Sequence, residues 1–274
     1  MLNIIVFSRN RACQLELFLR SMRHCFAQFN EFPVNVLYQY SDMRYQDGYS
    51  KLAGLSDFPK NVNMVKEISF QGNLIELLNE RNPYTVFFVD DMVWKERFSL
   101  KGGTFSSFTN DPDVLCLSLR LMRGLQYCYP LDTFNEIPRF DYENKWFWQG
   151  LVGDYGYPMS LDGHIFRTGD ILDIVLSFKC NSPNRLEAKM ALNPPHKRQK
   201  MVCCDISPVM NIPLNIVQTS WNNRHGSLSA LNLNKRFLSG ERISTENIYG
   251  IKNSSCHQII DIKFEQYLNK QRYW

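Results

Sequence analysis

Short apolar runs alternate with amphipathic stretches along the first third of the chain. Four of the runs have the length and composition of buried strands: residues 2–7, 34–39, 63–68 and 85–89. Between them, residues 12–29 carry apolar side chains at helical spacing, and a second helix is expected at residues 72–79. Such alternation is typical of a parallel sheet covered by helices. The pattern therefore predicts the α/β fold class with a mainly parallel central sheet.

The second half of the chain is less regular. Three further strands and a helix are expected there, the strands after Asp113 and at residues 163–167 and 202–205, the helix at residues 170–178. Residues 124–160 are dense in aromatic residues, Pro and Gly, and irregular segments of this kind often carry binding residues. The tail after Asn232 has helical stretches. Because no repeat or linker is visible, we expect one domain over residues 1–274.

The composition is that of an ordinary globular protein. Of 274 residues, 44% are hydrophobic and 21% charged, which excludes a disordered chain. Thirty-one Lys and Arg against 27 Asp and Glu leave a net charge of +4. Nucleic-acid-binding proteins usually have a concentrated basic patch, so no nucleic-acid partner is expected. The charge is compatible with an anionic small ligand or a weak attraction to an anionic membrane surface.

The sequence has no recognisable targeting or membrane-spanning segment. No run approaches the roughly 18 apolar residues of a membrane span, and the first residues lack the basic segment and cleavage site of a signal peptide. Eight cysteines are scattered without a C-x-x-C pair, which argues against a zinc ribbon or a redox motif. We therefore expect reduced, mostly buried thiols in a cytoplasmic protein.

Polar clusters follow three of the predicted strands, where ligands bind in open α/β sheets. The clusters are Ser8, Arg9 and Arg11, then Ser41 and Asp42, then Asp90 and Asp91. Arginines suit the phosphates of a nucleoside diphosphate, and carboxylates suit the Mg²⁺ or Mn²⁺ that neutralises them. Alone, Asp90 and Asp91 also fit a turn or a helix cap, and the turn that holds Ser8, Arg9 and Arg11 fits a solvated loop. Their joint occurrence in this order favours a nucleotide site.

Two of these clusters resemble motifs of glycosyltransferases of the GT-A fold, in particular the family-two members. The segment IIVFSRNR is similar to their opening strand and turn, and VFFVDDM to their strand followed by an Asp-x-Asp-type motif, with Met92 where a third Asp often occurs. The resemblance implies a GT-A-like Rossmann-type sandwich. Residues 1–110 would be the nucleotide-sugar-binding half and residues 111–274 the acceptor-binding half with a C-terminal tail. Asp91 would then bind Mn²⁺ or Mg²⁺, and Asp90 would lie nearer the sugar nucleotide.

The resemblance extends more loosely to the segment YPMSLDGHIFR in the second half. Asp162 matches the acceptor side of these enzymes and would bind sugar hydroxyls, although a β-turn Asp fits as well. Gly163 would allow the backbone to approach the donor closely. His164 fits either a structural histidine or a contact to the donor.

A helix start is expected at Ser182 because Pro183 follows it. Glu187 then lies in the early turns, where it either complements the helix dipole or corresponds to the acid that deprotonates the acceptor in inverting family-two enzymes. Ala188 stands where their motif has a second acid. By this resemblance Glu187 and Asp162 are the candidate catalytic residues.

Two histidines lie late enough in the chain to serve as the further metal ligand that many GT-A-like enzymes have. His225 is preceded by Arg224 and followed by Gly226, so this loop would bring an imidazole to the metal and a guanidinium to a phosphate. A loop histidine bonded to a backbone carbonyl is the other interpretation. His257 is expected at a helix start on the surface.

Two segments remain open to either interpretation. The cluster of Trp146, Phe147 and Trp148 suits the core or a platform on which sugars stack. The basic run at residues 196–200 suits a solvated loop or a lid that closes over a diphosphate.

The sequence thus predicts a metal-dependent glycosyltransferase with a nucleotide-sugar donor and a glycan or lipid-linked acceptor. It would be cytoplasmic, with a peripheral position at the inner membrane face as a further expectation. A nucleotidyltransferase that makes sugar nucleotides is the first alternative, but no glycine-rich phosphate loop follows Phe7. A non-catalytic carbohydrate-binding module is the second, and it would need no paired acids at a strand end.

Overall fold

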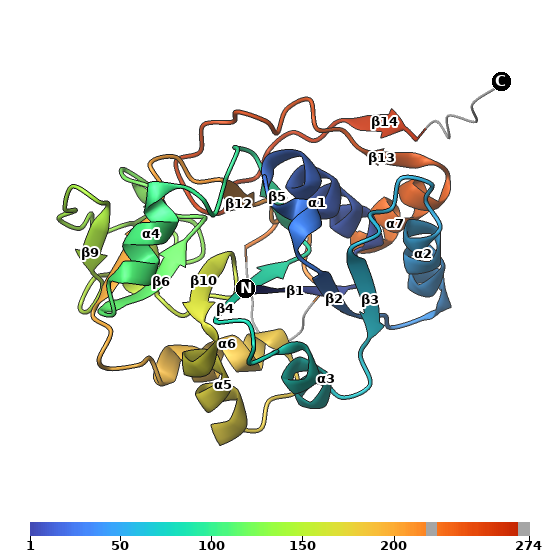
Figure 1. The fold of residues 1–274 in the computed structure, drawn as a ribbon. Helices are drawn as coiled ribbons and strands as arrows, with labels where there is room; N and C mark the ends of the chain where they lie inside the picture. The colour runs from blue at the N-terminus through green and yellow to red at the C-terminus, as the bar shows by residue number, and fades with distance from the viewer. Residues whose placement is uncertain (218–223, 268–274) are drawn as a thin grey trace.

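A computed structural model describes residues 1–217 and 224–267 of the chain. Its centre is an eight-stranded sheet with the order β3-β2-β1-β4-β10-β6-β11-β9 (Figure 1). The strands, in that order, are Val62–Lys66, Val34–Gln39, Leu2–Arg9, Tyr84–Val89, His164–Arg167, Val114–Ser118, Lys200–Cys203 and Lys145–Phe147. β10 and β9 run antiparallel to their neighbours, and the other strands run in one direction. The α/β class with a mainly parallel central sheet is confirmed.

Helices cover both faces of the sheet, as expected for a sandwich (Figure 1). On one side lie α1 (Ala12–Cys25), α2 (Met43–Ala53) and α7 (Ala230–Leu238); on the other lie α3 (Phe70–Leu77), α5 (Thr168–Ser177) and α6 (Pro183–Leu192). The remaining helix, α4 (Gly103–Asn110), packs against β6 and β11. Each side has its own apolar core, because alternate side chains of every strand point to opposite faces.

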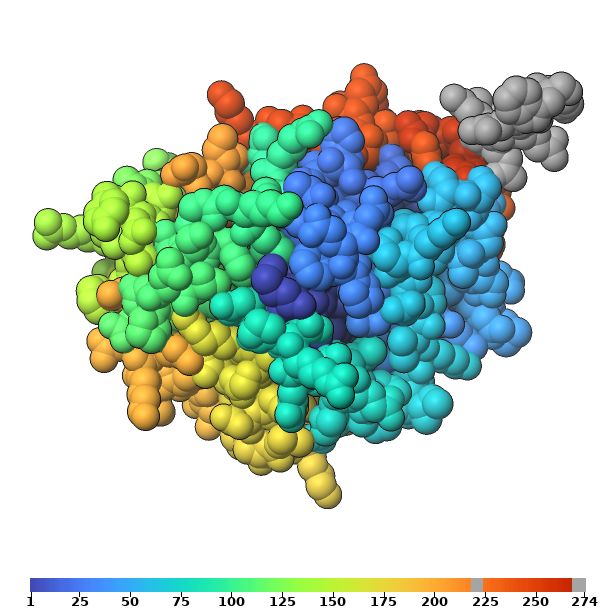
Figure 2. Space-filling model, viewed as in Figure 1, coloured from blue at the N-terminus to red at the C-terminus, as the bar shows by residue number. Residues whose placement is uncertain are grey.

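Three pairs of short strands lie outside the central sheet. They are β5 (Met92–Trp94) with β12 (Val209–Asn211), β7 (Tyr127–Cys128) with β8 (Thr133–Phe134), and β13 (Glu241–Ile243) with β14 (Phe264–Gln266). Two single 3-10 turns complete the described elements, at Phe29–Glu31 and Asp154–Gly156. The C-terminal segment, in orange and red, packs along the α1 and α2 side of the molecule (Figure 2).

The predicted strands of the first third are all present, and the boundaries of β2 are those expected. Two differences follow from local chemistry. The polar cluster at Ser41 and Asp42 is the start of helix α2, because the Asp42 side chain caps the helix by accepting a hydrogen bond from the Arg44 N–H at 3.0 Å. The aromatic segment also contributes a sheet strand, β9, in which Trp146 is buried.

All eight cysteines are free and buried, as predicted. Within the described residues, the helices are all too short or too polar to cross a bilayer. The tail expected to carry helical stretches contains α7, whereas its last residues, 268–274, lie outside the described part of the chain.

Candidate active site

A cavity of about 270 Å³ opens at the carboxyl ends of β1, β2, β3 and β4. We call it the cleft. Its lining residues come from sites as distant in the chain as Phe7 and His257. Most of the predicted site residues line it: Ser8, Arg9, Arg11, Asp90, Asp91, Asp162, Glu187, Arg224 and His225. Sheet order brings them together, because β1 pairs with β4 and β4 pairs with β10.

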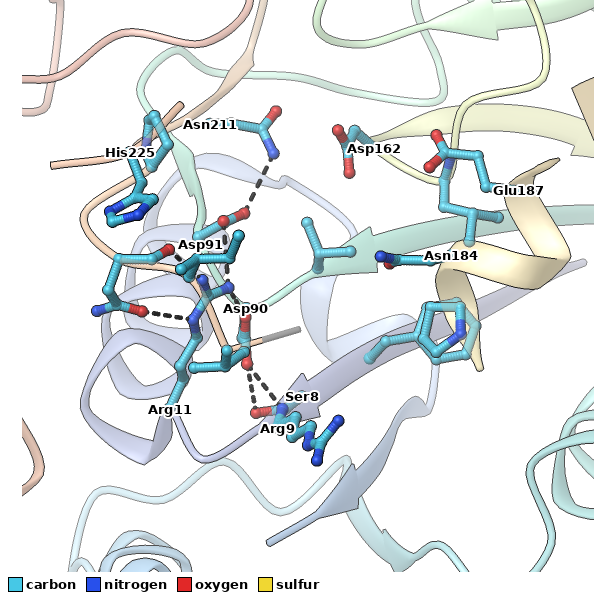
Figure 3. Close-up of a pocket in the computed structure, with 18 of the residues that line it drawn as sticks. Ser8, Arg9, Arg11, Asp90, Asp91, Asp162, Asn184, Glu187, Asn211 and His225 are labelled. Carbon is cyan, nitrogen blue, oxygen red and sulfur yellow. Dashed lines mark hydrogen bonds and ion pairs between the residues drawn. The ribbon is translucent and has the colours of Figure 1, made fainter. Parts of the chain in front are cut away.

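Asp90 is the anchor of the strand-end cluster. It directly follows β4 and is almost fully buried. Its Oδ2 accepts hydrogen bonds from the Ser8 hydroxyl at 2.9 Å and from the Arg9 backbone N–H at 3.0 Å, and its Oδ1 accepts from Arg11 Nη1 at 3.0 Å (Figure 3). The hydrogen bonds to this carboxylate are thus supplied by the protein itself. Asp90 therefore holds the turn after β1 in place.

Arg11 joins this cluster to the C-terminal part of the chain. Its Nη1 also donates to Asp91 Oδ2 at 3.2 Å, while its Nε donates to Asn215 Oδ1 at 2.8 Å and its Nη2 to the Asn215 carbonyl. Asn211 Nδ2 donates to the other oxygen of Asp91 at 3.2 Å (Figure 3). Asp91 thus lies between an arginine and an amide, and 17% of its side chain is exposed to the cleft.

The opposite wall carries two further carboxylates, Asp162 and Glu187, side by side in Figure 3. Asp162 Oδ2 accepts a hydrogen bond from the buried Arg120 at 3.1 Å and lies 3.5 Å from His257 Nε2. Burial alone would raise the pKa of the Asp162 carboxyl, but the hydrogen bond from His257 and the charge of Arg120 outweigh it and lower the pKa. Asp162 is therefore an ionised carboxylate at neutral pH.

The pKa of the Glu187 carboxyl is shifted in the opposite direction from that of Asp162. It lies on α6, and its Oε1 accepts hydrogen bonds from the Ser160 hydroxyl at 3.0 Å and from the Leu161 N–H at 3.2 Å. Burial, and then the negative charge of Asp162, raise the pKa of the Glu187 carboxyl to about 7. A carboxyl that titrates near neutral pH and faces a cleft has the properties of a general base or acid.

Three of the candidate residues do not reach the cleft. Ser41 is bonded to Asn10 through its hydroxyl and its backbone N–H, and Asp42 caps α2. His164 is completely buried, with Nδ1 2.9 Å from the Pro158 carbonyl. Burial, assisted by the charge of Arg120, lowers the pKa of His164 to about 3, so the imidazole is neutral. His164 is thus held inside the core and is not among the residues that line the cleft.

Gly163 also has a structural role in place of the expected approach to a ligand. Its φ of +73° is a conformation that favours glycine, and a Cβ there would lie 3.1 Å from both Met92 and Val209. Its neighbours are therefore core side chains. The residue allows the chain to turn into β10 directly after Asp162.

The loop at Arg224 and His225 lines the cleft from the C-terminal part of the chain. Both side chains are exposed; His225 Nδ1 lies 2.6 Å from the Gly226 carbonyl, and Arg224 pairs with Asp132 at 2.8 Å and lies over the Tyr129 ring. Residues 218–223, which precede this loop, lie outside the described residues.

The two segments whose sequence allowed two interpretations, the aromatic cluster and the basic run, do not line the cleft. Trp146 packs edge-on against Tyr155 in the core, and Phe147 is exposed. In the basic run, Arg198 pairs with Asp170 of α5 at 2.6 Å, and none of residues 196–200 lines the cleft. Neither segment has the position of a sugar platform or a lid over this site.

The sequence did not identify several lining residues. His257, expected on the surface, is half-buried beside Asp162, and its backbone forms an isolated β-bridge with Asn211. Two more lining residues are Gln39, the last residue of β2, and Glu67, which directly follows β3. For these two a signal was present, because each stands at the carboxyl end of a predicted strand. For Asn211 no local signal exists, and for His257 the only signal was its late position in the chain.

A divalent cation fits the cleft at Asp91. Each oxygen of this carboxylate accepts one hydrogen bond and has a further lone pair for a metal. Over the described ranges, no group of three or more His, Cys, Asp or Glu side chains is placed to hold a metal. Mg²⁺ usually binds through one or two carboxylates and takes its other ligands from water and substrate phosphates. The donor set thus suits a cation that binds together with a diphosphate.

No protein-family model matches the sequence, and no curated protein sequence matches it. Among solved structures, the chain is similar to TarS from S. aureus, with 16% identity and a TM-score of 0.41 over 72% of this chain and 33% of TarS. It is also similar to the mannosyltransferase PcManGT from Pyrobaculum calidifontis, solved in complex with GDP-Man and Mn²⁺, with 15% identity and a TM-score of 0.32 over 46% of this chain and 39% of that one.

An active-site mutant of LgtC is 10% identical, with a TM-score of 0.38 over 87% of this chain and 96% of LgtC. The chain spans well under two thirds of the first two proteins. All three TM-scores lie below 0.5, so the function proposed below depends on the geometry of the cleft.

Proposed function

We propose that this protein is a metal-dependent glycosyltransferase that moves a sugar from a nucleoside diphosphate to an acceptor hydroxyl. One observation carries the proposal. A single cleft at the carboxyl edge of the sheet has an arginine and a half-buried aspartate on one wall, and a glutamate with a pKa near 7 on the other. These are the groups needed to hold a charged leaving group and to remove a proton from an attacking hydroxyl.

The wall at Arg11 and Asp91 would hold the diphosphate. Arg11 is fixed by Asp90 and Asn215, so its charge is placed in advance and needs no rearrangement when charge develops on the leaving group. When bound at Asp91, with His225 as a second ligand, Mn²⁺ or Mg²⁺ would neutralise the leaving diphosphate. Arg9 and Arg224, both exposed at the cleft, would add cationic contacts to the donor.

Glu187 would act as the base. The acceptor hydroxyl gives its proton to the carboxylate as its oxygen attacks the anomeric carbon. The bond from that carbon to the diphosphate oxygen breaks, and its electron pair leaves with the nucleoside diphosphate. A single displacement of this kind inverts the anomeric configuration. Asp162, held ionised by Arg120 and His257, would accept hydrogen bonds from sugar hydroxyls beside it.

The acceptor would be a glycan or a lipid-linked precursor. The β7–β8 hairpin supports an acceptor with an apolar part, since Pro130 lines the cleft while Leu131, in the loop, and Phe134, in β8, expose their side chains. Residues 1–110 would then form the donor half and residues 111–274 the acceptor half of one catalytic domain. A cytoplasmic enzyme at the inner membrane face is the setting we propose.

The proposal is tested with purified protein, Mn²⁺ and a panel of nucleotide sugars, with nucleoside diphosphate release as the readout. We expect turnover of at least one donor, and a loss of at least about 100-fold in Asp91→Ala, because the cation contributes several kcal/mol of charge stabilisation. His225→Ala should weaken the metal-dependent part of donor binding. Asp173→Ala, at an exposed position of α5, is the matched control and should keep full activity. Unchanged turnover in Asp91→Ala would show that the metal assignment is wrong.

A further inference from the structure

Three polar side chains form a row across the carboxyl ends of neighbouring strands in the cleft. Arg9 and Gln39 are paired residues of the parallel strands β1 and β2, and Gln39 Nε2 donates a hydrogen bond to Glu67 Oε2, just beyond β3, at 3.4 Å. Within the described residues, none of these three side chains forms a hydrogen bond with Arg11 or Asp91. It occupies the end of the cleft nearest the β3 edge of the sheet.

An apolar floor lies on the same face of the sheet. Because side chains alternate along a strand, Phe7 points to the side of Arg9, and Leu37 to the side of Gln39. Phe7 and Leu37 are themselves paired across β1 and β2, and both line the cleft. The Phe7 ring is held by Phe70 and Phe87, with ring centroids at 5.5 and 5.6 Å. A rigid apolar floor ending in polar groups suits a flat heterocycle read along one edge.

Glu67 is the group in this row with unused hydrogen-bonding capacity. Within the described residues, its half-buried carboxylate has one hydrogen bond, the long one from Gln39. Burial raises the pKa of the Glu67 carboxyl, and the charge of nearby Arg9 opposes this shift. A partly desolvated acceptor with one weak donor gains most from a ligand that supplies N–H groups.

We propose that Glu67 and Gln39 select a guanine base, so that the donor is a guanosine diphosphate sugar. Guanine presents two adjacent donors, N1–H and the 2-amino group, which match the two oxygens of a carboxylate, and next to them the O6 acceptor, which matches the Gln39 amide. Uracil offers one N–H between two carbonyls, and the corresponding edge of adenine has an unprotonated N1, so neither satisfies both oxygens. The inference rests on the proposed function, because it takes the cleft to be a nucleotide-sugar site.

The test is a set of binding measurements on the intact protein with Mn²⁺, by calorimetry, for GDP, IDP, UDP, ADP, 2′-deoxy-GDP and 2′-deoxy-ADP. IDP differs from GDP only by the missing 2-amino group, so it isolates one hydrogen bond to Glu67. We expect GDP to bind on the order of 10-fold more tightly than IDP and at least that much more tightly than UDP and ADP, as for a hydrogen bond to a charged group. Because the proposal places Glu67 at the base and not at the ribose, 2′-deoxy-GDP should keep the preference over 2′-deoxy-ADP.

A variant localises the effect. Glu67→Gln places an N–H donor against the donors of guanine, so GDP affinity should fall by roughly 10- to 100-fold and the ratio of GDP to IDP affinity should approach one. Glu76→Gln, at an exposed position of α3, is the matched control and should leave both affinities unchanged. If Glu67→Gln does not fold, the ratio of GDP to IDP affinity in the unchanged protein still tests guanine recognition, because equal affinities would overturn it.

The outcomes separate the two proposals. Tighter binding of GDP than of IDP, lost in Glu67→Gln, supports guanine recognition. Equal affinities for all the nucleotides, a preference for UDP, or an unchanged ratio in Glu67→Gln would overturn it while leaving a nucleotide-sugar site in place. If none of the nucleoside diphosphates binds in the presence of Mn²⁺, the proposed function fails.

Discussion

Two neighbouring carboxyl groups in the cleft have different pKa shifts because their surroundings differ. Asp162 has a guanidinium and an imidazole beside it, and these hold its pKa low. Glu187 accepts hydrogen bonds from a hydroxyl and an N–H, both uncharged, and its burial, together with the negative charge of Asp162, raises its pKa to about 7. Paired acids whose pKa values are driven apart commonly divide the roles of base and charged partner. This difference is why we assign the base to Glu187.

The pH profile of turnover tests this assignment. A base must be deprotonated, so the rate should rise as pH passes through about 7 and level off above it. Glu187→Gln should lower the rate by roughly 10² to 10⁴-fold and remove this dependence, with little change in donor affinity. Glu80→Gln, an exposed change, should leave the profile intact. A product with retained anomeric configuration would contradict the role of Glu187 as a base.

The same residue should lower stability at the pH at which it works. The folded protein binds the Glu187 proton more tightly than the unfolded chain, in which the pKa of glutamate is about 4.3. Stability from this group is therefore present at low pH and is lost as pH rises through about 7. At pH 8 we expect Glu187→Gln to increase the free energy of unfolding by roughly 1–3 kcal/mol, measured by urea denaturation, and the gain should shrink toward pH 5. A loss of stability at pH 8 would contradict the raised pKa.

At the scale of elements, the start of α6 places the base. The Ser182 hydroxyl caps the helix by accepting from the Arg185 N–H at 3.4 Å, and Glu187 follows in the second turn. Ser182→Ala should cost roughly 0.5–2 kcal/mol of stability and also lower kcat, because fraying moves Glu187. Ser229→Ala removes the cap of α7, where the hydroxyl accepts from Asn232 N–H at 3.1 Å, and none of the α7 residues lines the cleft. It should cost similar stability and leave kcat unchanged. Equal kcat in both variants would show that α6 is not a positioning element.

The turn into β10, which follows Asp162, depends on the backbone conformation of Gly163. Gly163 has a φ of +73° and accepts and donates backbone hydrogen bonds with Leu119 and Phe87 at 2.9 and 2.8 Å. Gly163→Ala should lower the free energy of unfolding by roughly 1–3 kcal/mol, because an alanine is strained there and its Cβ meets core side chains. In Gly169→Ala, in the first turn of α5, the added Cβ has no atom within 4 Å, so this control should be neutral or stabilising. Equal urea midpoints for the two variants would contradict this account.

At the scale of the whole molecule, the cleft joins segments from both ends of the chain. Arg11 near the N-terminus holds Asn215, and His257 lies beside Asp162. A ligand in the cleft binds only the folded state, so it should stabilise the protein. With Mn²⁺ and a nucleoside diphosphate at about 100 times its Kd, the gain is about 2.7 kcal/mol, which corresponds to a rise in Tm of roughly 5–10 °C. The rise should be smaller in Asn215→Ala, which removes the side-chain acceptor of Arg11 Nε. No rise in the unchanged protein at millimolar ligand would contradict the site.

The sequence by itself determined the features that depend on local periodicity and on the ends of strands. The runs of β1, β2 and β4, the acids that follow β4 and the helix start at Ser182 are readable because a buried strand must be apolar and a helix needs a cap. Only the tertiary structure decided which of these groups meet. The antiparallel placement of β10 brings Asp162 into the cleft and buries His164, and the path of the C-terminal segment brings His257 to Asp162. Such contacts join residues far apart in the chain, and they depend on strand order and on which face a side chain points to, quantities that no local pattern encodes.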